Sequence, residues 1–285
     1  AAEAAAAQAA PTTVLDPGCR LSYLTDVEGN FEYFLAFVEL SEALSLMSTD
    51  GADGAVDLEL AEGWVFVFGG GAVDKGGAVG GSIRVARSLV ALKHKYPQRV
   101  CLLVGNRDIT KMRISSELTA AQLADERLDR AVGPDWVPEG RRVSPLAFLK
   151  ALCAADELGG GGGGVGDDAV CESFVSSVRP GGFMHDLLHE GQLAAIHGGN
   201  LLVHGGVSSA DGVALGRVPG REGDVPSVGE WAELLNAWYR QQLQEWDAAP
   251  CLPSDAVADI AVEGGVGDDA VCESFVSSVR PGGFM

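Results

Sequence analysis

Short apolar runs alternate with amphipathic stretches along the chain. Four of the runs are rich in leucine, β-branched or aromatic residues and are bounded by turn residues, so each predicts a buried strand. They cover residues 21–25, 64–68, 100–104 and 201–203. Between and after them, apolar residues recur at the spacing of a helix face. These stretches predict helices over residues 31–38, 82–96, 117–131, 145–157, 182–194 and 231–246, with Ser82 as the N-cap of the second.

Strands that alternate with helices are typical of an α/β fold with parallel βαβ units. Each predicted strand is followed by a turn that combines glycine with Asp, Glu, Asn, Arg or His. In open α/β sheets, ligands bind at the carboxyl ends of the strands, where glycine lets the backbone come close. We therefore expect the four turns to converge on one site. The polar stretch 48–57 is expected to be a loop.

Three segments stand apart from this regular pattern. Residues 1–18 are rich in alanine at their start and are expected to form a disordered or frayed tail. A glycine-rich linker is expected at 159–166, inside a main domain of residues 19–263. Residues 163–184 recur letter for letter at 264–285, and we expect the second copy to be poorly packed.

The charge of the chain limits its partners. Among 285 residues, 40 Asp and Glu face 20 Lys and Arg, for a net charge of −20. Such a field argues against duplex nucleic acid or an anionic membrane surface, because both are polyanions. No apolar run approaches the roughly 18 residues that span a bilayer. Six cysteines without a CxxC pair favour a reducing compartment, and so a cytoplasmic location.

The turn sequences themselves carry a resemblance. The order DVEGN (26–30), GGGAVDKG (69–76), GNRD (105–108) and VHGG (203–206) resembles the calcineurin-like metallophosphoesterases, in particular a divergent branch with DVEGN and GNRD. The resemblance covers roughly residues 21–110 and 180–245. It implies a two-sheet β-sandwich flanked by helices (αββα). It also implies hydrolysis of a small phosphoester or a phosphoprotein by a hydroxide that divalent metal ions activate.

The same resemblance implies roles for individual residues. Those that match metal-binding positions are Asp26, Glu28, Asn106 and His204. Lys75 and Arg107 would steady the phosphate, with Asp108 orienting the guanidinium of Arg107. Glu28 stands where the family has histidine, and a carboxylate favours Mn²⁺ or Mg²⁺, with iron or zinc as further candidates.

Three departures from the family motifs bear on activity. Gly71 stands where the family has an aspartate that bridges two metals, and Arg107 replaces a histidine. No histidine follows His204, although the family supplies a further metal ligand there. The alternative to an enzyme is therefore a catalytically inactive phosphate- or metal-binding module on the same fold. If Gly71 is the main defect, Gly71→Asp is expected to raise metal occupancy and hydrolysis.

A second histidine pair lies outside these motifs. His185 and His189 are four residues apart on one predicted helix face, a spacing that suits a metal ion. The glutamate of an HExxH motif is missing, so we expect the two side chains to be solvated. The tryptophan-rich helix at 231–246 is expected to pack in the core.

Overall fold

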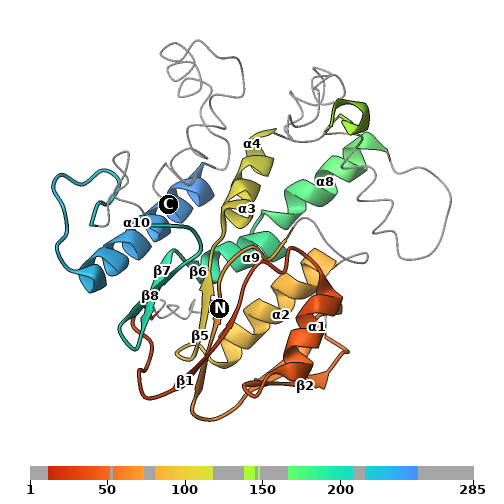
Figure 1. The fold of residues 1–285 in the computed structure, drawn as a ribbon. Helices are drawn as coiled ribbons and strands as arrows, with labels where there is room; N and C mark the ends of the chain where they lie inside the picture. Colours follow the sequence, from red (N-terminus) through yellow and green to blue (C-terminus); the bar gives the residue numbers. More distant parts are fainter. Residues whose placement is uncertain are drawn as a thin grey trace, which may run out of the picture.

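A parallel sheet forms the centre of the protein, in a computed structural model that describes residues 12–51, 54–73, 81–117, 138–144, 147, 166–207 and 216–249. Its strands lie in the order β1-β4-β5-β6, of which β1, β5 and β6 are labelled in Figure 1. Their bounds are β1 Arg20–Leu24, β4 Trp64–Phe68, β5 Val100–Leu103 and β6 Gly191–Gln192. The first three match predicted buried strands. An α/β fold is therefore confirmed.

The central strands are buried on both faces, which explains their almost continuous apolar sequence. Because side chains alternate along a strand, Phe66 and Phe68 enter a large core on one face. Val65 and Val67 enter a smaller core on the other face. All four side chains are at most 1% exposed.

Helices cover the face with the larger core. Figure 1 shows α1 and α2 side by side below α9, and residues of α1, α2, α9 and α10 all enter this core. Their bounds are α1 Phe31–Leu40, α2 Gly81–Lys95, α9 Phe183–Glu190 and α10 Val228–Ala248. The further helices are α3 Asn106–Ile109, η2 Thr110–Arg113, α4 Ile114–Glu117, η3 Glu139–Arg141 and α8 Asp167–Ser177.

Helix ends follow local chemistry. Asn30 caps α1 by accepting a hydrogen bond from the Tyr33 backbone N–H at 3.0 Å, as a short polar N-cap does. The expectation that Ser82 caps α2 is wrong, because that helix already begins at Gly81. A Cβ at Gly81 would lie 2.0 Å from the Gly29 carbonyl oxygen, so the helix starts tightly against the turn after β1.

The tryptophans of α10 pack against core residues, as predicted; they are Trp231, Trp238 and Trp246.

The second face of the sheet is covered by an antiparallel hairpin of β7 (Ala194–His197) and β8 (Asn200–Val203). Ala195 of this hairpin packs against Val65, Val67 and Leu103. The predicted strand at 201–203 is therefore present, but it belongs to the hairpin and not to the parallel sheet. The helix predicted over 182–194 ends at Glu190, because the extended backbone of Gly191 turns the chain into β6.

A second hairpin joins β2 (Leu44–Ser48) to β3 (Asp57–Leu60) beside α1 and α2. The predicted loop at 48–57 connects these strands, which the sequence pattern did not reveal. β2 exposes three successive residues, so its apolar pattern is weak.

The N-terminal segment corrects the expected tail. Residues 12–18 are part of the described structure, and Leu15 is 1% exposed. Its backbone N–H donates to the Ile196 carbonyl at 2.8 Å, and the Ile196 N–H donates to Thr13 at 2.8 Å. The assignment of these residues to a frayed tail is wrong, because they extend the pairing of β7.

Several expectations fall outside the described residues. They are the linker up to residue 165, nearly all of the helices at 117–131 and 145–157, and the second repeat copy at 264–285. No helix in the described part of the chain is long and apolar enough to cross a bilayer.

Candidate functional site at the strand ends

The turns after β1 and β4 run side by side. The Asp26 N–H donates to the Gly70 carbonyl at 2.9 Å, and the Glu28 N–H donates to the Gly71 carbonyl at 2.8 Å. Asp26 and Glu28 both have φ of +51°, a left-handed conformation that few residues other than glycine adopt. The two motif turns are therefore held together by their backbones, with their side chains left for other contacts.

Glycines let the other two turns join them. A Cβ at Gly70 would lie 2.6 Å from His204 Nδ1 and 2.7 Å from the Gly105 nitrogen. A Cβ at Gly105 would lie 2.5 Å from the Gly71 nitrogen. No side chain fits at such separations. The predicted convergence of the four turns is thus observed, and glycine is what makes it sterically feasible.

Asp108 holds these turns together through hydrogen bonds to their backbone. Its side chain accepts hydrogen bonds from the backbone N–H groups of Gly71, Ala72 and Gly105, at 2.9, 2.9 and 2.8 Å. The residue is 1% exposed. Burial raises the pKa of Asp108, against the three backbone donors and His204, which lower it. Asp108 positions the turns and does not face the site.

The orientation of Arg107 has a different origin from the expected one. Asp108 is engaged with the backbone, and Arg107 Nη1 instead lies 3.4 Å from Glu28 Oε1. Both side chains are partly exposed, at 32% and 25%. Glu28, predicted to bind metal, is thus an ion-pair partner of the arginine, and the expected orientation by Asp108 is wrong.

His204 and Asn106 meet as predicted. His204 Nδ1 lies 2.8 Å from the Gly69 carbonyl oxygen, which only accepts hydrogen bonds, so Nδ1 carries the proton. The other ring nitrogen, Nε2, lies 3.3 Å from Asn106 Oδ1. A histidine anchored in this way by its other nitrogen is the usual arrangement of a metal ligand.

Asp26 lies at the edge of this group. It is exposed, and the Thr25 hydroxyl donates to its Oδ2 at 2.9 Å. Gly71 is its close neighbour, with φ of +71°. A Cβ at Gly71 would lie 2.7 Å from Asp26 Oδ1 and 3.1 Å from its Cα. An aspartate at position 71 would therefore collide with Asp26. Lys75, predicted to contact phosphate, lies outside the described residues.

A second cluster of potential ligands was missed. Within the described ranges, the group of His, Cys, Asp or Glu side chains whose ligand atoms all lie within 4.8 Å of one another is His185, His189 and Asp247. Asp26, Glu28 and His204 do not form such a group. The histidine spacing was visible in the sequence, but nothing in the sequence placed Asp247 beside it.

Comparisons with known proteins do not assign the chain to a family. No family model matches the chain, and no curated protein matches it. Solved structures that are similar to the chain include two of phosphatases. A cold-active protein tyrosine phosphatase has a TM-score of 0.36 at 16% identity, over 83% of this chain and 54% of that one. The cold-active protein-tyrosine phosphatase of a psychrophilic Shewanella species has a TM-score of 0.35 at 16% identity, over 88% and 56%.

The chain thus spans about half the length of those phosphatase chains. At TM-scores this low, the likeness decides neither the fold nor the activity of this protein.

Proposed function

We propose that the chain is a phosphoester hydrolase of the calcineurin-like type that depends on a divalent metal ion. The observation that carries the proposal is the setting of His204, whose Nδ1 is anchored on Gly69 while Nε2 faces Asn106 Oδ1 at 3.3 Å. These residues come from three of the four turns that resemble that family. The substrate would be a small phosphoester or a phosphoprotein.

The residues at the strand ends suit one cation better than two. In the metal-bound form, Nε2 of His204 without a proton and Oδ1 of Asn106, 3.3 Å apart, would both bind the ion, and Asp26 would offer a carboxylate from the adjoining turn. Gly71 offers no bridging carboxylate, and Glu28 is paired with Arg107. We therefore propose one ion, with Mn²⁺ or Mg²⁺ favoured by the oxygen ligands.

When bound, such an ion would neutralise charge on the phosphate and activate water for attack. The chain's own part is to place positive charge and to hold the ligands. Arg107 keeps its proton at neutral pH, so it can stabilise a phosphate but cannot protonate a leaving group. Glu28 holds the guanidinium in place. Substrates with good leaving groups, such as aryl phosphates, should therefore react faster than alkyl phosphates.

The test uses the full chain, stripped of metal with a chelator and then given Mn²⁺ and an aryl phosphate. We expect metal-dependent release of the phenolate. His204→Ala should lower the rate by about 100-fold or more, because it removes a ligand that touches the ion.

The matched control is His94→Gln. His94 is a half-exposed histidine on α2 that pairs with Glu190 at 2.8 Å, away from the strand-end turns. Its loss should leave the rate unchanged. If the folded wild-type chain shows no metal-dependent release, the proposed activity is rejected.

The inactive phosphate- or metal-binding module stays as the alternative, and Gly71 is the observation that favours it. Turnover separates the two from each other, because both would bind one ion at the strand ends; Asp247→Asn removes the second cluster, so that the metal counted is the ion at the strand ends. A chain that binds one Mn²⁺ and a phosphate without turnover would be the module.

A further inference from the structure

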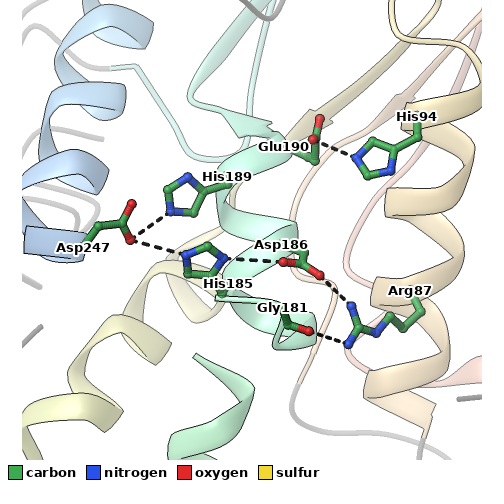
Figure 2. A network of polar contacts seen from close by, with 8 residues as sticks. All are labelled: Arg87, His94, Gly181, His185, Asp186, His189, Glu190 and Asp247. Carbon is green, nitrogen blue, oxygen red and sulfur yellow. Dashed lines mark hydrogen bonds and ion pairs between the residues drawn. The ribbon is translucent and has the colours of Figure 1, made fainter. Parts of the chain in front are cut away.

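The cluster of His185, His189 and Asp247 lies between two helices on the helical side of the protein. Both histidines come from α9, one turn apart, and Asp247 comes from the last turn of α10 (Figure 2). The helices are 58 residues apart in sequence at the His189–Asp247 contact. The sequence expectation that the histidines are solvated is wrong, because the His185 and His189 side chains are only 13% and 28% exposed.

The two distances from Asp247 to the histidine nitrogens are those expected between ligand atoms of one metal ion. Asp247 Oδ1 lies 3.3 Å from His185 Nε2 and 3.2 Å from His189 Nε2. Zinc binds histidine nitrogen and carboxylate oxygen at about 2.0–2.1 Å in a tetrahedron, whose edges are then about 3.3 Å. An ion could therefore bind with little movement of these edges.

One atom of the cluster lacks a hydrogen bond. His185 Nε2 is buried and makes no hydrogen bond with the described residues, although Asp247 Oδ1 is near. A buried polar atom without a partner costs free energy. The two imidazole rings are stacked, with centroids 4.2 Å apart, so both present Nε2 towards the same carboxylate.

A carboxylate next to the cluster, that of Asp186, contacts the second nitrogen of His185. His185 Nδ1 faces Asp186 Oδ1 at 3.5 Å, and the other oxygen of Asp186 accepts a hydrogen bond from Arg87 at 2.6 Å (Figure 2). A carboxylate behind a histidine is the common arrangement at zinc sites. His189 and Asp247 also lie in the last turns of α9 and α10, where the negative ends of the helix dipoles favour a cation.

From these contacts we propose that His185, His189 and Asp247 form a transition-metal site, with Zn²⁺ as the preferred ion. Two imidazoles and one carboxylate suit zinc better than Mg²⁺ or Ca²⁺, which prefer oxygen ligands alone. Three protein ligands leave a fourth position for water or a further group. The ion would join the end of α10 to α9. The site is separate from the strand ends and does not depend on the proposed hydrolase function.

Zinc titration of the metal-free full chain tests the site. We expect Zn²⁺ to bind and to raise the Tm, because an ion that binds only the folded state stabilises it. His189→Gln and Asp247→Asn should each weaken binding at this site by about tenfold or more. The control His94→Gln should bind as the wild type does, and His204→Ala should remove any zinc at the strand ends but not this one.

Unchanged zinc affinity in both His189→Gln and Asp247→Asn would overturn the proposal. A measurement on the wild type covers the case in which a variant does not fold. In crystals grown with Zn²⁺, anomalous scattering should place an ion within bonding distance of both Nε2 atoms and Asp247. Anomalous density elsewhere, with none at this cluster, would overturn the proposal as well.

Discussion

At the scale of single residues, the strand-end site depends on the absence of side chains at its glycines. Gly70, Gly71 and Gly105 each have a neighbour within 2.7 Å of the place where a Cβ would lie. The space that side chains would take is filled by His204, Asp26 and backbone. Substitution at these positions is therefore expected to disturb the conformation of the turns, whatever its effect on metal binding.

Gly71→Asp tests this directly. The sequence alone predicts a gained metal ligand, whereas the structure predicts no gain in metal and a loss of stability. A left-handed φ costs a non-glycine residue about 1–2 kcal/mol, and the contact with Asp26 adds to it. Urea unfolding and metal analysis measure the two effects.

Gly63→Asp is the matched control for this change. Gly63 has a similar φ of +75°, but nothing lies within 4 Å of its Cβ position. Gly71→Asp should be clearly less stable than Gly63→Asp. Equal stability of the two variants would contradict the proposed collision, and a gain of bound metal would favour the sequence-based expectation.

At the scale of elements, Asp108 holds the start of α3 against the turn after β4. Three backbone N–H groups converge on its two oxygens, and two of them belong to the neighbouring turn. One buried side chain thus fixes the spacing between two strand ends. Asn106, two residues earlier, takes its place beside His204 from the same short helix.

Asp108→Asn should destabilise the protein by about 2 kcal/mol, because an amide nitrogen would face a buried N–H donor that then has no partner. Urea unfolding measures the loss. Asp224→Asn is the control, since Asp224 pairs with Arg217 on the surface and its side chain is 67% exposed. The control should change stability by less than about 0.5 kcal/mol. Equal losses in the two variants would show that the buried contacts of Asp108 add nothing.

The elements also show which parts of the fold could be predicted from the sequence. The apolar runs of β1, β4 and β5 and the turns after them predicted both the sheet and the meeting of Asn106 with His204. β6 has two residues, too few for any periodic signal. The roles of Asp108 and Asp247 depend on which distant groups face them. The sequence alone does not distinguish an aspartate that binds backbone N–H groups from one that is solvated.

At the scale of the whole molecule, the N-terminal segment closes the second face of the sheet. Leu15 packs in the smaller core with Val65 and Val67. Asn236 of α10 ties this region together, since its amide nitrogen donates to the Thr13 hydroxyl at 3.0 Å and to the Ala194 carbonyl at 2.8 Å. A segment whose composition suggests a tail is therefore part of the folded unit.

Leu15→Ala should lower the free energy of unfolding by about 2–4 kcal/mol, the usual cost of a large cavity in a core. Val14→Ala is the control, because Val14 is 51% exposed and does not belong to that core. It should change stability by less than about 0.5 kcal/mol. Urea unfolding of both variants measures the difference. Similar, small effects would restore the view of these residues as a tail.

The hairpin that carries His204 also sets the order in which the site can be completed. β1, β4 and β5 all precede residue 104, whereas the His204 contact with Gly69 spans 135 residues and that with Asn106 spans 98. Contacts between residues so far apart in sequence form slowly. During synthesis, three turns of the site are made before the histidine leaves the ribosome. The nascent chain can therefore have three of the four strands of the parallel sheet and still lack a complete strand-end site.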